Sequence, residues 1–108
     1  MTAFNVYDID GRELVGNLSE VEAFKIAFRK ANDRSERLVI SPVGSTFELG
    51  EEIRPGLNTE QRSTIEGWLN DALHANDQKA ATICRLALSG HYEEMTRCVV
   101  RIRYGEQL

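Results

Sequence analysis

Residues 19–31 have the sequence SEVEAFKIAFRKA, and this pattern predicts an amphipathic helix. Ser19 followed by Glu22 forms a capping box, because the serine oxygen can accept the backbone N–H of the third helical residue. The apolar residues recur at helical spacing and form one stripe: Val21, Phe24, Ala27, Phe28 and Ala31. A helix with one apolar side must bury that side against another element, so the rest of the chain has to supply a surface for it.

The segments on either side of this helix predict a sheet as that surface. Residues 3–8 and 12–15 are strand-like runs joined by an Asp-Gly turn, in which glycine accepts a positive φ angle without steric cost. After the helix, residues 38–41 and 46–49 predict a second hairpin. Pro42 cannot donate to a strand ladder, so this hairpin is expected at a sheet edge or a bend.

Two further helices are predicted in the second half of the chain. The capping pair Asn58 and Gln61 introduces a helix over about residues 59–74. An Asn-Asp pair then predicts a break, with Asp77 capping a third helix that ends at a Ser-Gly pair. One kinked helix across residues 59–89 is the alternative.

Residues 95–104 alternate in character and predict a last strand. One side carries Thr96, Cys98, Val100, Ile102 and Tyr104. The other side carries Arg97, Arg101 and Arg103 around Val99. Alternation of this kind is typical of a strand with one face in the core and the other in water.

The element order β-β-α-β-β-α-α-β predicts an α+β fold. We expect a two-layer sandwich of a roughly five-stranded, mainly antiparallel sheet with three helices on one face. The strand order is left open. Residues 1–108 are too few for two independent cores, so a single domain is expected. Phe28 and Trp68 are predicted to be buried aromatic side chains of its core.

Composition places the chain among ordinary soluble domains. Hydrophobic residues make up 42% and charged residues 28% of the chain, and the net charge is −4, which argues against a strongly basic nucleic-acid binder. No apolar run approaches the length of a membrane span, and the N-terminus does not resemble a secretory leader. A cytoplasmic location and a bacterial or phage origin are therefore expected, with no membrane partner.

The sequence lacks the motifs of catalysis and of metal binding. Cys84 and Cys98 show no zinc-ligand spacing with each other or with His74 and His91, and both fall on predicted apolar faces. We interpret them as buried core thiols. Phosphate-binding loops and nucleophile elbows are missing as well. The sequence therefore predicts no catalytic residue, no cofactor and no metal site.

The arginine row of the last predicted strand is the main candidate site. If the helices cover the other face, Arg97, Arg101 and Arg103 project from an open sheet face as partner-binding residues. Together with the missing chemistry, this favours a small non-enzymatic interaction protein, a regulator, adaptor or inhibitor that binds another protein or a second copy of itself. Weak nucleic-acid binding through the arginine face is one alternative, and a small enzyme with an unrecognised site is the other.

Overall fold

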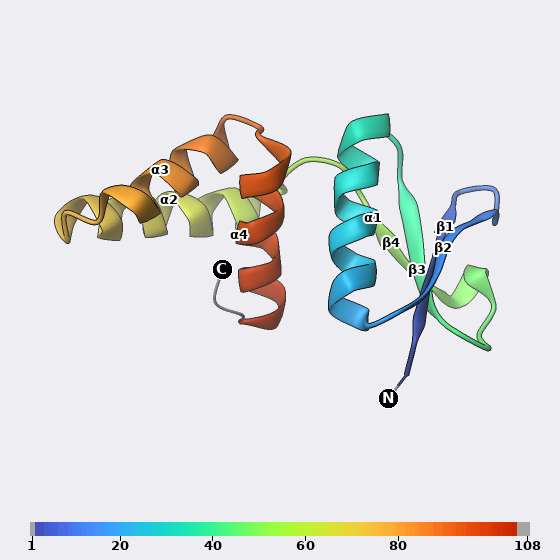
Figure 1. The fold of residues 1–108 in the computed structure, drawn as a ribbon. Helices are drawn as coiled ribbons and strands as arrows, with labels where there is room; N and C mark the ends of the chain where they lie inside the picture. Colours follow the sequence, from blue (N-terminus) through green and yellow to red (C-terminus); the bar gives the residue numbers. More distant parts are fainter. Residues whose placement is uncertain (1, 106–108) are drawn as a thin grey trace. The chain divides into compact units, whose positions relative to one another are not determined.

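The structure, a computed structural model, describes residues 2–105 and has an α+β fold (Figure 1). Its chain divides into two compact units, one up to Pro55 and one from Gly56 onward. We call them the sheet unit and the helical unit. The described residues hold a four-stranded antiparallel sheet and four α-helices. The α+β class is as predicted, whereas the predicted numbers of five strands and three helices are wrong.

The sheet unit is built on four strands in the order β2-β1-β3-β4. They are β1 (Phe4–Asp8), β2 (Glu13–Leu18), β3 (Leu38–Pro42) and β4 (Glu51–Ile53). All three neighbouring pairs are antiparallel. The pairing of β2 with β1 is irregular, with register shifts and a positive φ angle of 64° at Asn17. The opposite edge, β4, has three residues. The central pair β1 and β3 therefore carries the regular part of the sheet.

Helix α1 (Glu20–Arg34) lies along one face of this sheet, as Figure 1 shows. Its first turn is capped as predicted, since Ser19 Oγ accepts the backbone N–H of Glu22 at 3.2 Å. Phe24 and Phe28 are buried and stack on each other with ring centroids 6.0 Å apart. Strand register places four apolar side chains on the face below them, all buried: Val6, Leu38, Ile40 and Ile53. Burial of these two apolar surfaces against each other is the core of the sheet unit.

The opposite face of the sheet is covered by the segment from Val43 to Gly50. Phe47 lies with its ring centroid 6.0 Å from that of Tyr7. Ser41 Oγ donates to the carbonyl of Thr46 at 3.2 Å. A Cβ atom on Gly50 would lie 2.5 Å from Cγ1 of Val39, so only glycine fits this approach. Strand β3 is therefore buried on both faces.

The strand predicted over residues 46–49 is wrong. Phe47–Leu49 forms a short 3-10 helix, η1. Beside β1, the other partner of β3 is β4, a segment for which no strand was predicted. The sequence TFEL has strand propensity, but these residues cross the sheet face instead of pairing along it. Leu49 is consequently 79% exposed.

The helical unit consists of α2 (Thr59–His74), α3 (Gln78–Leu88) and α4 (Tyr92–Tyr104), which contact one another. The capping box of α2 is as predicted, with Gln61 N donating to Asn58 Oδ1 at 2.7 Å and Asn58 N donating to Gln61 Oε1 at 2.9 Å. Asp77 caps α3, and the preceding Asn76 has a positive φ angle of 54°. Residues 59–89 are therefore two helices and not one kinked helix.

The strand predicted over residues 95–104 is also wrong, because these residues form most of α4. The apolar residues of this segment fit the period of a helix and that of a strand. Met95, Cys98, Val99 and Ile102 follow helical spacing, whereas Cys98, Val100 and Ile102 alternate as in a strand. The helix also has the signals of its ends. Glu93 and Glu94 occupy the first turn, Arg101 and Arg103 the last, and Gly105 is the left-handed C-cap.

No helix within residues 2–105 has the length and the apolar composition that crossing a bilayer requires.

Candidate functional site

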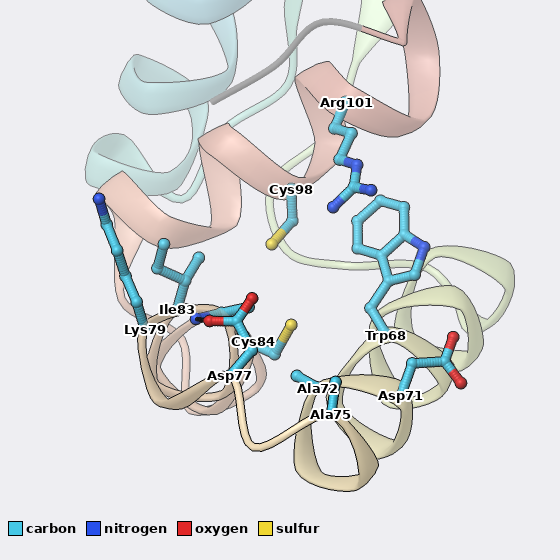
Figure 2. A pocket seen from close by; sticks show the side chains of 11 residues that line it. Trp68, Asp71, Ala72, Ala75, Asp77, Lys79, Ile83, Cys84, Cys98 and Arg101 are labelled. Carbon is cyan, nitrogen blue, oxygen red and sulfur yellow. Dashed lines mark hydrogen bonds between the residues drawn. The ribbon is translucent and has the colours of Figure 1, made fainter.

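A cavity of about 530 Å³ opens among the three helices of the helical unit (Figure 2). Helix α2 contributes Trp68, Asp71 and Ala72, with Ala75 just beyond its end. Helix α3 and its cap contribute Asp77, Lys79, Ala80, Ile83 and Cys84, and α4 contributes Cys98 and Arg101. Its volume falls within the usual range of ligand pockets, about 300–1,000 Å³.

The wall between α2 and α4 is an arginine placed over a tryptophan. The guanidinium carbon of Arg101 lies 4.4 Å from the ring centroid of Trp68, within the range of a cation–π contact. Trp68 is half-buried and Arg101 is exposed, so the pair faces solvent as well as the cavity. Figure 2 shows the guanidinium group beside the indole and directed toward the cavity.

The floor of the cavity carries both thiols of the chain. Cys84 and Cys98 are free and buried, and Figure 2 shows their sulfur atoms directed into the same space. Burial raises the pKa of Cys84, opposed by the charge of Arg101. Burial also raises the pKa of Cys98 to about 11, assisted by Cys84. Both side chains are thus protonated at neutral pH and act as small neutral apolar groups, which matches the prediction of core thiols.

The charged rim of the cavity has mixed sign. Asp77 caps the N-terminus of α3, where its Oδ1 accepts a hydrogen bond from the backbone N–H of Ala80 at 3.1 Å. Lys79 lies in the same first turn, and Asp71 lies on α2. The helix dipole offsets the charge at Asp77, because the N-terminus of a helix is partly positive. The rim therefore carries two acidic side chains, Asp71 and Asp77, and two cations, Lys79 and Arg101.

The three arginines predicted to bind a partner lie on helix α4. Arg101 is the one that lines the cavity. Arg103 donates from Nε to the hydroxyl of Tyr104 at 2.9 Å. Arg97 lies one turn before Arg101 on α4 and does not line the cavity. The prediction that they project from an open sheet face is wrong, because residues 95–104 are helical.

Sequence reasoning did not connect Trp68 with this site. Trp68 was predicted as a core residue, yet it is half-buried and lines the cavity. One available signal was the helical spacing of Cys98 and Arg101, which lie three residues apart on one face of α4. That spacing identifies a shared face only once the segment is recognised as a helix.

The two histidines lie away from the cavity. His74 Nδ1 lies 2.8 Å from the carbonyl of Asn70, His91 precedes α4, and neither lines the cavity. Within residues 2–105 no three histidine, cysteine or acidic side chains are grouped as metal ligands.

Comparison with family models, with curated proteins and with solved structures gives no match for this chain.

The raised pKa of Cys98 predicts a loss of stability at alkaline pH. The unfolded chain releases this proton near pH 9.0, whereas the folded chain holds it to about pH 11. The unfolded state binds fewer protons in that window, so the free energy of unfolding falls as pH rises through it and is unaffected by this group below it. Denaturant titrations of the wild type and Cys98→Ala at several pH values test this. Equal pH slopes for the two proteins would contradict it.

Proposed function

We propose that the chain is a non-enzymatic interaction protein, a regulator, adaptor or inhibitor that binds a partner protein at the cavity of the helical unit. The Trp68–Arg101 pair carries this proposal. Tryptophan and arginine are enriched among the residues that contribute most to protein–protein binding, especially where they border an apolar pocket. Here the pair borders a floor of alanines, Ile83 and protonated thiols.

Catalysis has less support from the same residues. The cavity offers two thiols as nucleophiles, and burial raises the pKa of each of them. A thiol has to lose its proton before it attacks, and the proton is harder to remove in an apolar setting. Neither histidine lines the cavity to accept it.

Nucleic-acid binding also has less support than protein binding. Its basis was a row of arginines on an open sheet face, and that face does not carry them. A chain with a net charge of −4 also repels a polyanion. Weak binding of nucleic acid stays a prediction that the experiment below can detect.

The proposal is tested by capture with the purified full chain as bait, in an extract of its own host. We expect one protein to be retained by the wild type, lost with Arg101→Glu and weakened with Trp68→Phe. The control Leu49→Ala removes an exposed apolar side chain of the sheet unit and should retain the protein fully.

Reconstitution from purified components completes this test. The chain has one tryptophan, so the fluorescence of Trp68 reports on the cavity directly. Binding of the captured protein should change that fluorescence and saturate. Capture that the cavity variants leave unchanged would overturn the proposal. So would retention abolished by nuclease, or turnover of a small substrate by the purified chain.

A further inference from the structure

Arg101 has a charge that the described part of the chain leaves unpaired. Its guanidinium lies over Trp68 and forms neither a hydrogen bond nor an ion pair with residues 2–105, although Asp71 lines the same cavity. By contrast, Arg37 and Arg54 both contact Glu52, at 3.4 and 2.9 Å. An arginine placed against an aromatic ring still presents its N–H edge, which matches the two oxygens of a carboxylate.

The cavity floor does not compete for this charge. Cys84 and Cys98 would be anions beside Arg101 if they were ionised, but burial keeps both protons in place against the pull of the guanidinium. Ala72, Ala80 and Ile83 complete the apolar lining. An arriving group therefore finds the guanidinium of Arg101, with Lys79 further along the rim, above an apolar surface. One ligand with an anionic group and an apolar group can contact both the guanidinium and that surface.

The rim does not concentrate positive charge. The formal charges of Lys79 and Arg101 are matched by those of Asp71 and Asp77, so the rim has no excess of positive charge for a phosphate dianion or a nucleic-acid backbone. A single carboxylate on an apolar body fits this balance best.

We propose that the cavity binds an acidic segment of the partner protein, with one carboxylate on Arg101 and a neighbouring apolar side chain on the thiol-lined floor. This inference rests on the proposed function and names the chemistry of its partner. Ile102 favours a chain segment over a free acid: it lies one turn beyond Cys98 on the same side of α4 and is exposed. A segment that reaches Arg101 can cover Ile102, whereas a small acid inside the cavity cannot.

The test uses blocked tripeptides with a central glutamate flanked by leucine, valine or phenylalanine, each with a matched central glutamine. Each peptide is titrated into the full chain while Trp68 fluorescence is followed. We expect at least one glutamate peptide to bind about tenfold more tightly than its glutamine match, the usual effect of one hydrogen-bonded charge. Arg101→Gln should remove that preference, and Arg101→Lys should keep only part of it, because lysine lacks the planar fork.

Arg97→Gln is the matched control, because it removes the same charge from the same helix outside the cavity lining. It should leave the preference for glutamate unchanged. Circular dichroism checks that every variant remains folded. Equal affinities for glutamate and glutamine peptides, no binding by any of them at millimolar concentration, or an equal loss in Arg97→Gln would each overturn the inference.

Competing ligands separate the sources of the anion. If octanoate binds more tightly than every peptide, the cavity binds a free acid, and the inference of a partner segment is contradicted. If inorganic phosphate or a single-stranded oligonucleotide displaces the best peptide, the inference that the ligand is a carboxylate is contradicted. If glutamate and glutamine peptides bind alike while protein capture still depends on Trp68, the proposed function stands and this inference alone fails.

Discussion

Replacing Phe28 with alanine is expected to lower the free energy of unfolding by about 3–5 kcal/mol, the usual range for deleting a buried aromatic side chain. Phe28 is 2% exposed, stacks on Phe24 and lies in the layer between α1 and the sheet. Alanine would leave a void that the neighbouring strands cannot close. Chemical denaturation measures the loss, and Leu49→Ala, at 79% exposure, is the matched apolar control with an expected change below about 0.5 kcal/mol.

A loss below about 1 kcal/mol for Phe28→Ala would contradict this packing. The same titration tests the expectation of a single domain. Trp68 fluorescence reports on the helical unit, whereas Phe28 belongs to the sheet unit. If the chain unfolds as one domain, the variant shifts the fluorescence and circular dichroism transitions together. A fluorescence transition that stays in place would show that the units unfold separately.

Replacing Ile65 with alanine is expected to cost about 2–5 kcal/mol. Ile65 is the fully buried large side chain of α2, with 0% exposure. Leu73 lies on the same helix at 43% exposure, so Leu73→Ala is the matched control. Denaturation followed by Trp68 fluorescence measures both variants. Equal losses for the two would contradict the orientation of α2.

The substitution Trp68→Ala tests core packing less directly than the sequence predicts. Its indole is half-buried, so Trp68→Ala deletes less buried surface than a core aromatic would lose. Its removal is expected to cost less stability than removal of Phe28, although both were predicted as core aromatics. The difference is consistent with a contact role at the cavity.

The helices with strong end signals were predictable from local sequence. Ser19, Asn58 and Asp77 each cap a helix, because a short polar side chain satisfies a backbone N–H within three residues. These interactions involve only neighbouring residues, so the sequence contains all the information they need. The hairpin of β1 and β2 is similarly local, since its Asp-Gly turn joins the two strands directly.

The segment that became α4 could not be assigned in the same way. Val99, Val100 and Ile102 favour a strand by propensity, and their order fits both the period of a strand and that of a helix. Packing on α3 decides between the two, and that packing is tertiary. The same limit applies to β4, whose three residues are defined by their pairing with β3 more than by their own composition.

The candidate site was predictable only in part. Arg101 was named as a partner-binding residue, but from a strand that does not exist. The contact between Arg101 and Trp68 joins residues that are distant in the sequence, and the common cavity of Cys84 and Cys98 joins two separate helices. Local patterns contain no information about such long-range contacts.

The two edge strands of the sheet affect how the protein behaves at high concentration. Fibrillar aggregation can begin where a long, regular edge strand presents unpaired backbone N–H and C=O groups to another molecule. Here β4 is short and carries the charged Glu51 and Glu52, while β2 is interrupted by its register shifts and by Asn17. Neither edge strand is a good template for the addition of a strand from another molecule, so cross-β growth from the native state is disfavoured.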